Sequence, residues 1–195
     1  MTHAAGSGAR FRYCPLCGTQ LVRRAPEASP RSAPSRSHCP ACAFVHYRNP
    51  IAAVAGILLS RDGTLPPADH LVTPREAGAI LLVRRAAEVS YPGHWCIPCG
   101  YIEYDEDVRR AMEREMHEES GLRVTAEEVY AVHSNFHEPH NHTVGIWFLG
   151  RYRGGALRAG DDAERARFYP LDRLPEPLAF PTDRKVLAAL LREAG

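Results

Sequence analysis

Short apolar runs recur along the chain beyond Pro50 and give the first indication of its elements. The run at 51–59 is rich in small and branched residues and predicts a buried strand. Residues 94–103 also have a strand-like composition, but a proline and a glycine interrupt them. Further strands are predicted at 79–85, 123–136, 143–153 and 166–171.

The segment 105–121 has the clearest helical pattern. Its apolar stripe, at i, i+3, i+4 and i+8, consists of Val108, Ala111, Met112 and Met116. Gly121 is expected to end this helix. Residues 181–195 predict a second amphipathic helix with Thr182 or Asp183 as its N-cap. Strands combined with a central and a terminal helix favour an α+β fold or a three-layer α/β/α fold.

The composition is that of an ordinary globular protein, with 45% hydrophobic and 24% charged residues among 195. The formal net charge of +1 excludes a global field that would draw the chain to nucleic acid or to an anionic membrane. No apolar run approaches the roughly 18 residues of a membrane span, and the N-terminus lacks the apolar core of a secretory signal. We therefore expect a cytoplasmic protein without a membrane partner. Its six cysteines are then metal ligands or free thiols rather than disulfides.

Composition divides the chain into three parts. Residues 1–10 are small and polar and are expected to be disordered. A first unit covers 11–47, and its segment 23–37 is so rich in Pro, Ser and Arg that we predict a mobile loop there. A larger domain covers 48–195 and contains the long apolar patterns.

Two Cys-Pro-x-Cys motifs in the first unit predict a zinc site. Their cysteines are Cys14, Cys17, Cys39 and Cys42. Four thiolates complete a tetrahedron and leave no open position, so the predicted role is structural, in a zinc ribbon too small to have its own core. Reduced thiols in an ordinary hairpin are the plain alternative. The arginines between the motifs could instead contact the phosphates of a nucleic acid, although a solvated charge run is the commoner explanation.

Glu115, Glu118 and Glu119 share one face near the end of the helix predicted at 105–121. Three carboxylates there repel one another and oppose the helix dipole, so a sequence selected for stability alone would avoid them. Bound Mg²⁺ or Mn²⁺ would reverse that cost, since both ions favour oxygen ligands and keep positions open for substrate phosphates. The plain alternative is a solvated helix face whose charges neighbouring arginines balance.

The residues from Gly100 to Leu122 resemble the Nudix box, G-x5-E-x7-R-E-U-x-E-E-x-G-U, in which U is a bulky aliphatic residue. The defined positions are all matched, by Gly100, Glu106, Arg114, Glu115, Met116, Glu118, Glu119, Gly121 and Leu122. The flanking segments LLVRR and LAFPT are also similar to this family. The resemblance implies a Nudix α/β/α sandwich with a mixed sheet, behind a small four-cysteine zinc ribbon. It also implies a hydrolase that cleaves the pyrophosphate bond of a nucleoside diphosphate linked to another moiety.

The same resemblance gives roles to the box residues. The implied ligands of catalytic Mg²⁺ or Mn²⁺ are the Gly100 carbonyl and the carboxylates of Glu115, Glu118 and Glu119. Arg114 would orient Glu115, which is a ligand or a base, and Glu106 would support the site. Many family members carry the base on a later loop, where the candidates are Asp161, Asp162 and Glu164. Bound metals would clamp the pyrophosphate, neutralise developing charge and lower the pKa of the attacking water.

Candidates for substrate contact lie outside the box. They are Arg84, His137, His140 and Phe180. The two histidines belong either to a polar loop over the active site or to a plain exposed loop. Phe180 either stacks on a base or packs in the core.

A zinc ribbon before a Nudix domain resembles two groups of enzymes. One group consists of NADH pyrophosphatases, which also act on NAD-capped RNA and carry a Ser-Gln-Pro-Trp-type motif after the box. That motif is missing between Val124 and Phe148, and VHYRNP and LAFPT are more similar to the second group, which acts on ADP-ribose or FAD. We therefore favour hydrolysis of ADP-ribose or FAD with release of AMP. The alternatives are an NADH or NAD-capped RNA pyrophosphatase, a nucleic-acid-binding ribbon and a non-catalytic nucleotide sensor. A homodimer is expected from the resemblance alone.

The stretch from Trp95 to Cys99, Trp-Cys-Ile-Pro-Cys, resembles the redox motif of thioredoxins. The residues after Cys99 predict an extended strand, in which positions i and i+3 point to opposite faces about 10 Å apart. We therefore expect no disulfide between Cys96 and Cys99 and no redox role. Cys99 stands where the Nudix pattern usually has glycine, so we expect an altered local turn.

Overall fold

The computed structural model describes residues 11–24, 36–139, 141–160 and 162–194. The disorder expected for 1–10, the base candidate Asp161 and the substrate candidate His140 lie outside the described residues. Contacts divide the chain into two compact units, Met1–Pro50 and Ile51–Gly195, and each is described by itself.

Three short antiparallel strands form the sheet of the first unit. They are β1 (Val22–Arg24), β2 (Arg36–His38) and β3 (Val45–His46), in the order β1-β2-β3. Arg24 pairs with Arg36, so both ends of the segment 23–37, which we expected to be a mobile loop, belong to a sheet. Composition does not reveal them, because backbone pairing stabilises a strand even where few side chains are buried.

The strands of the second unit form two sheets. The strands are β4 (Ile51–Ile57), β5 (Leu59–Ser60), β6 (Ala79–Arg85), β7 (Trp95–Cys96), β8 (Cys99–Tyr101), β9 (Leu122–Asn135), β10 (Thr143–Gly155) and β11 (Ala163–Pro170). One sheet has the order β8-β4-β10-β9, with β10 parallel to β4 and the other pairs antiparallel. The other has the order β11-β6-β5, and β7 also pairs with β6. The helices are the 3₁₀-helix η1 (Pro74–Glu76), α1 (Val108–Ser120) and α2 (Pro181–Ala194), and none in the described ranges is long and apolar enough to cross a membrane.

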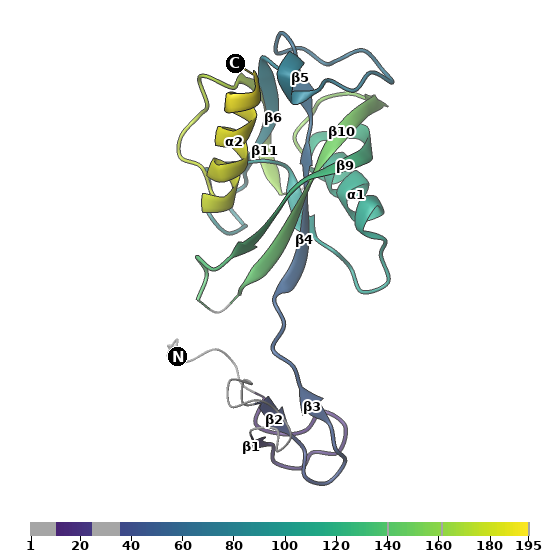
Figure 1. Cartoon of the computed structure of the whole chain (residues 1–195), viewed down its shortest axis with the longest axis vertical. Helices are drawn as coiled ribbons and strands as arrows, with labels where there is room; N and C mark the ends of the chain where they lie inside the picture. The colour runs from purple at the N-terminus through teal and green to yellow at the C-terminus, as the bar shows by residue number, and fades with distance from the viewer. Residues whose placement is uncertain (1–10, 25–35, 140, 161, 195) are drawn as a thin grey trace. The chain divides into compact units, whose positions relative to one another are not determined.

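Side chains from Val54 to Leu58 alternate between two hydrophobic cores. Ala55 and Ile57 pack into the core that includes residues of α2, whereas Val54 and Leu58 pack into the core that includes residues of α1. In Figure 1 the two helices accordingly lie on opposite sides of the strands. The α/β/α layering expected of the larger domain is therefore confirmed.

The helix predicted from the apolar stripe is α1, and its ends have clear local causes. Asp107 is the N-cap, and its carboxylate accepts a hydrogen bond from the Arg109 N–H at 3.0 Å. Gly121 ends the helix in the left-handed conformation. Met112 and Met116 are fully buried, which fixes the rotation of α1 and thereby the direction of its glutamates.

The closing helix α2 begins at Pro181, so the prediction of Thr182 or Asp183 as its N-cap is wrong. Both residues lie in the first turn and are buried, and proline is favoured at the first helical position. The Asp183 carboxylate accepts hydrogen bonds from the Ile97 N–H at 3.0 Å and from the Trp147 indole N–H at 3.3 Å. It therefore holds neighbouring segments instead of capping its own helix.

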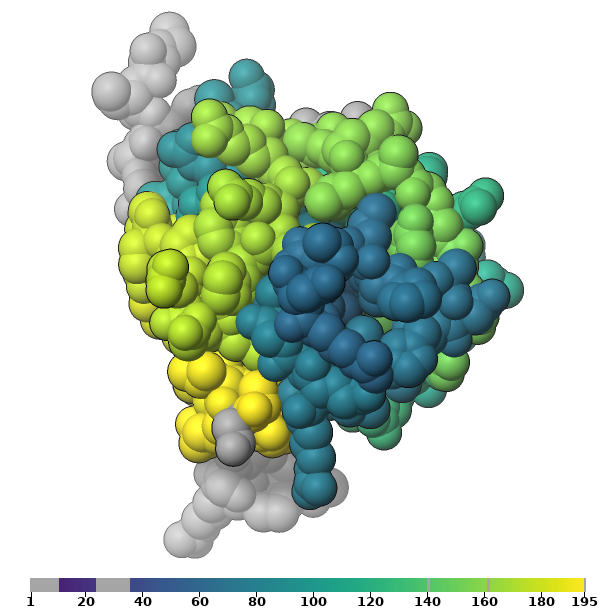
Figure 2. Space-filling view, turned by 90° about the horizontal axis from the view of Figure 1, so that it is seen from above, coloured from purple at the N-terminus to yellow at the C-terminus, as the bar shows by residue number. Residues whose placement is uncertain are grey.

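The long connection between β5 and β6, residues 61–78, folds back onto the second unit. The Asp69 N–H donates to the Tyr152 carbonyl at 2.9 Å, and the Asp69 carbonyl accepts a hydrogen bond from Arg151 at 3.0 Å. Val72 is buried in the core that includes residues of α2. Figure 2 looks onto this face, where the blue connection lies beside the yellow of α2 and the green around residues 150–160. The connection thus covers one end of a core.

Candidate functional site

A cavity of about 650 Å³ lies beside α1 in the second unit. One part of its lining is acidic, and it includes Glu115, Glu119, Asp162 and Asp183 beside Gly100. Another part is aromatic and basic, and includes Arg85, Tyr91, His137 and Phe180. The volume and this mixture of polar and apolar groups are typical of a small-molecule site.

Gly100 marks a close approach of β8 to α1. A Cβ atom at this position would lie 2.1 Å from the carboxyl carbon of Glu115, closer than non-bonded atoms can come. The missing side chain therefore leaves the room that the Glu115 carboxylate occupies. Burial raises the pKa of Glu115, and Arg114, which donates a hydrogen bond to it at 2.7 Å, opposes that shift.

Glu119 is the most deeply placed of the box carboxylates, with only 5% of the residue exposed. Burial raises its pKa to about 8, and the negative charge of Glu115 adds to this shift. A hydrogen bond from the Cys99 N–H opposes it. That hydrogen bond to Oε2 is 2.9 Å long and fixes the carboxylate on the cavity wall. A carboxylate so costly to ionise fits a cation ligand, because a bound metal would supply the missing positive charge.

One guanidinium, that of Arg114, holds three box carboxylates. It donates to Glu106 at 2.7 and 2.9 Å, to Glu115 at 2.7 Å and to Glu118 at 2.8 Å. It also donates to the Tyr101 carbonyl at 3.1 Å. The paired bonds lower the pKa of Glu106. Since three carboxylates share one positive charge, the cluster stays net negative and can accept a divalent cation.

Glu118 does not contribute to the described lining of the cavity, unlike the other two glutamates implied as metal ligands. Its side chain is 44% exposed. Within the described ranges, only the cysteines of the first unit form a group of three or more ligand side chains whose donor atoms all lie within 4.8 Å. Glu115 and Glu119 are therefore the carboxylates already directed at the cavity, and Glu118 would have to release Arg114 to join them.

The structure brings one of the two described base candidates to the cavity. Asp162 lines it, directly before β11, whereas Glu164 forms an ion pair with Arg84. Arg84, a substrate candidate, also donates to the Gly93 carbonyl at 2.9 Å and is not part of the cavity lining. Its neighbour Arg85 lies there instead, because successive residues of a strand point to opposite faces.

His137 and Phe180, the other described substrate candidates, both line the cavity. Tyr91 lies with them, and its ring centroid is 5.6 Å from that of His137 and 5.7 Å from that of Phe180. No sequence pattern singles out Tyr91, because its position depends on contacts with residues far along the chain.

Asp183 lines the cavity, whereas the sequence pattern predicted only a helix cap at this position. Burial raises its pKa to about 7, and the hydrogen bonds from Ile97 and Trp147 oppose that shift. A signal was available, since the residue stands at the i, i+3, i+4 and i+7 spacing of the buried residues Val186, Leu187 and Leu190. An acid in register with the apolar stripe of a helix is a buried acid.

The cysteines of the thioredoxin-like stretch lie closer together than predicted. β7 ends at Cys96 and β8 begins at Cys99, so no continuous strand separates them. Both pack against one small hydrophobic cluster, and the neighbouring Cys96 thiol, together with burial, raises the pKa of Cys99. We expected Cys99, which stands in place of a glycine, to alter the local turn. Cys99 does not have a positive φ, so its backbone is not strained there. A raised pKa keeps the thiol protonated and so opposes thiolate chemistry. That these cysteines have no redox role stays a prediction.

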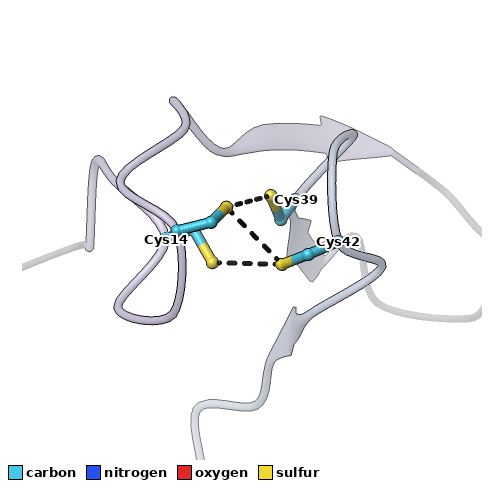
Figure 3. Close-up of side chains that lie close together, drawn as sticks. Cys14, Cys39 and Cys42 are labelled. Carbon is cyan, nitrogen blue, oxygen red and sulfur yellow. Dashed lines mark hydrogen bonds between the residues drawn. The ribbon is translucent and has the colours of Figure 1, made fainter.

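The four cysteines of the first unit converge. Their sulfur atoms lie within 4.8 Å of one another, and Figure 3 shows the labelled thiols directed toward a common centre. Each motif closes a turn, in which the Cys14 N–H donates to the Thr19 carbonyl at 2.8 Å and the Cys39 N–H to the Phe44 carbonyl at 2.7 Å. Hydrogen bonding with Thr19 lowers the pKa of Cys17 to about 6. At Cys42 a hydrogen bond with the Phe44 backbone lowers the pKa, but the neighbouring thiols of Cys14 and Cys39 raise it to about 12. Thiols packed this closely cannot all ionise unless a cation lies between them.

The first unit has almost no core of its own. Among its described residues only Cys14 and Cys39 are buried. A unit with so little buried apolar surface needs another source of stability, and a metal held by four thiolates can supply it. The donor set and its closed arrangement fit Zn²⁺.

Comparison with known proteins gives two family matches and several relatives. A family model described as the NUDIX domain matches residues 64–190, and one described as Nudix N-terminal, a zinc ribbon, matches residues 12–48. An ADP-ribose pyrophosphatase of Methanocaldococcus jannaschii is 33% identical over 135 residues, which are 69% of this chain and 69% of that protein. A NAD-capped RNA hydrolase, NudC, of Stutzerimonas stutzeri is 27% identical over 183 residues, which are 93% of this chain. The chain spans only 55% of that relative's length.

Solved structures agree with these matches. The crystal structure of a NUDIX hydrolase from Nitrosomonas europaea is similar with a TM-score of 0.72 and 27% identity, and the match covers 94% of this chain and 92% of that one. The NUDIX domain of Shewanella oneidensis NrtR, complexed with ADP ribose, is similar with a TM-score of 0.57. That match covers 75% of this chain and 89% of that one at 20% identity, so it bears on the fold alone.

Proposed function

Because the chain belongs to the Nudix hydrolase family, we propose that it hydrolyses the pyrophosphate bond of ADP-ribose or FAD and releases AMP. The observation that carries the proposal is the cavity onto which both Glu115 and Glu119 open beside Gly100. Carboxylates on the wall of a cavity of this size suit a substrate whose phosphates are held through divalent cations. The 33% identical ADP-ribose pyrophosphatase supports ADP-ribose as the first choice.

We assign the catalytic Mg²⁺ or Mn²⁺ to Glu115, Glu119 and the Gly100 carbonyl, with Glu118 as a further ligand once it leaves Arg114. When bound, the metal would neutralise phosphate charge and acidify a water molecule. The chain's own part is to hold the ligands in place. Arg114 orients Glu115 through its 2.7 Å hydrogen bond, and the Cys99 N–H orients Glu119.

Asp162 is our choice for the base, because it is the described candidate that lines the cavity. Its carboxylate would accept the proton of the attacking water. Arg85, in the same lining, carries a positive charge that can bind a phosphate oxygen as negative charge develops there. We assign Zn²⁺ to the four cysteines of the first unit. It would have no part in this chemistry, because four thiolates leave it no open position.

The test measures AMP release from ADP-ribose, FAD, NADH and NAD with Mg²⁺ or Mn²⁺, for the wild type and for Glu119→Gln. Glu113→Gln is the matched control, because Glu113 lies on α1, pairs with Arg110 at 2.8 Å and is not part of the cavity lining. The wild type and the control should release AMP, whereas Glu119→Gln should lose more than about 100-fold in turnover. Undiminished turnover by a folded Glu119→Gln protein would refute the metal assignment. Turnover of none of these compounds would refute the substrate class.

NAD-capped RNA is a second candidate substrate. The NudC relative favours it, because the match extends over 93% of this chain and therefore over both units. The same assay should include an RNA with a 5′ NAD cap beside an uncapped RNA. Faster cleavage of the cap than of ADP-ribose would make NAD-capped RNA the first candidate substrate and ADP-ribose the second.

A further inference from the structure

Charge is divided unequally between the two units of the chain. Residues 1–50 contain seven arginines and one acidic residue, so their formal charge is +6. Residues 51–195 contain 17 basic and 22 acidic residues, so their formal charge is −5. Zn²⁺ held by four thiolates would add −2 to the first unit and leave it at +4. The net charge of +1 is thus the sum of an acidic unit and a basic unit, and the basic unit can attract a polyanion by itself.

The first unit also exposes large apolar side chains. Among its described residues only Cys14 and Cys39 are buried, although a unit with so small a core would gain stability by burying more. The exposed large apolar residues of this unit are Phe11, Tyr13, Leu16, Val22 and Tyr47. Apolar groups that stay exposed on a basic unit indicate a surface that contacts a partner.

The strand register places an arginine and a tyrosine on one face of the first unit's sheet. Val22 pairs with His38 and His38 pairs with Val45, so these three side chains lie side by side across β1, β2 and β3. Arg36 and Tyr47 each stand two positions from a member of this row, which puts them on the same face. Their contact agrees, since the Arg36 guanidinium carbon lies 5.1 Å from the centroid of the Tyr47 ring. We call this surface the basic sheet face.

The two faces of this small sheet differ in what contacts them. His46 points to the opposite face, where the Phe11 ring packs edge-on against it with the centroids 4.7 Å apart. On the basic sheet face, Tyr47 is 58% exposed and Val22 is 43% exposed. The Tyr47 ring and the positive charge beside it are therefore accessible to a ligand.

We propose that the basic sheet face binds single-stranded nucleic acid, with one base stacked on Tyr47 and a neighbouring phosphate bound by Arg36. An exposed ring next to a guanidinium matches the two parts of a nucleotide, the planar base and the anionic phosphate. The strand has to be single, because the bases of a duplex stack on one another and cannot reach the ring. This inference goes beyond the proposed function, since it concerns the first unit and a ligand that needs no pyrophosphate bond.

The test measures the fluorescence anisotropy of a labelled oligouridylate of about 12 nucleotides as the whole chain is added at low salt. The oligomer has a 5′ hydroxyl and no Mg²⁺ is added, so hydrolysis plays no part. Tyr47→Ala should weaken binding about tenfold, the effect of one lost base stack, whereas Tyr47→Phe keeps the ring and should bind like the wild type. Arg36→Gln should weaken binding and lower the slope of log affinity against log salt by about 0.7, the effect of one phosphate contact. A DNA strand of equal length shows whether the ribose hydroxyls contribute.

Tyr104→Ala is the matched control, because Tyr104 is 99% exposed but stands among acidic residues of the second unit. It should bind the oligomer like the wild type. Limited proteolysis within residues 11–47 checks that the first unit of each variant is folded. No binding by the wild type at low salt, or undiminished binding by a folded Tyr47→Ala protein, would overturn the inference. A duplex that binds as tightly as the single strand would also overturn it, because charge alone would then explain the binding. AMP release is measured separately, so its absence beside intact oligomer binding would remove the proposed hydrolysis alone.

Discussion

Two buried acids face one cavity from different helices, Glu119 from α1 and Asp183 from α2. Burial raises their pKa values to about 8 and about 7. Ionising either carboxyl group makes the folded state less stable. Such a cost at a cavity wall indicates a functional role rather than a purely structural one. A bound cation would offset this cost for Glu119. For Asp183, the N–H groups of Ile97 and Trp147 and the charge of Arg85 offset it in part.

Gly100→Ala is expected to damage the site and spare the fold. The new methyl group would displace the carboxyl group of Glu115, which ends a flexible side chain and can move without disturbing the backbone. Misplacing a metal ligand by about 1 Å lowers turnover by about 100-fold. Steady-state kinetics and the thermal midpoint of the variant check this. A variant with wild-type turnover would show that the close approach of Gly100 to Glu115 has no catalytic role.

Asp183→Asn is expected to remove part of the pH dependence of stability. The folded pKa of about 7 lies above the ordinary value of 3.8, so the folded protein holds the proton more tightly than the unfolded chain. Wild-type stability should therefore fall between about pH 4 and pH 7, by no more than about 4 kcal/mol for this group. The variant should lack that part of the slope. Urea unfolding of both proteins in metal-free buffer at pH 5 and pH 8 measures it, and parallel curves would contradict the assignment.

At the scale of elements, periodicity predicted those helices and strands whose buried residues follow one regular spacing. The run 79–85 became β6, and the stripe within 105–121 became α1. Neither pattern could tell that Arg85, and not Arg84, reaches the cavity. A strand covered on both faces carries no sequence sign of which face adjoins a site. Asp183 was missed because its role lies in hydrogen bonds to other elements.

The contact between α1 and β4 gives a prediction for a pair of variants. A Cβ atom at Gly56 would lie 2.4 Å from Sδ of Met116, so Gly56→Ala should lower the free energy of unfolding by about 1–3 kcal/mol. Met116→Ala should lower it by about 2–5 kcal/mol. The double variant should lose less than the sum, because the shorter side chain at 116 leaves room for the added methyl group. Urea unfolding followed by tryptophan fluorescence measures all three, and additive losses would contradict this packing.

At the scale of the molecule, the two units are stabilised in different ways. The second has hydrophobic cores that include residues of both helices, whereas the described part of the first buries only Cys14 and Cys39. The same contrast explains what could be predicted. Zinc ligands and box glutamates lie at short, fixed spacings, so a motif reveals them. The rings of Tyr91, His137 and Phe180 come from three separate segments, so only the folded chain brings them together.

Removing the Zn²⁺ that we assign to the first unit is therefore expected to unfold that unit and leave the second one folded. Without a metal, the four thiolates lose the interaction that holds two turns together, and little buried surface remains to replace it. A zinc-selective chelator should expose residues 11–47 to limited proteolysis, while the fluorescence of Trp95 and Trp147 stays native, because both lie in the second unit. Cys39→Ala should behave like the chelated protein, and Cys96→Ala should keep its zinc.

A simultaneous change in tryptophan fluorescence would mean that the second unit depends on the first. Unchanged protease resistance after zinc loss would mean that the cysteines are not the main source of the first unit's stability.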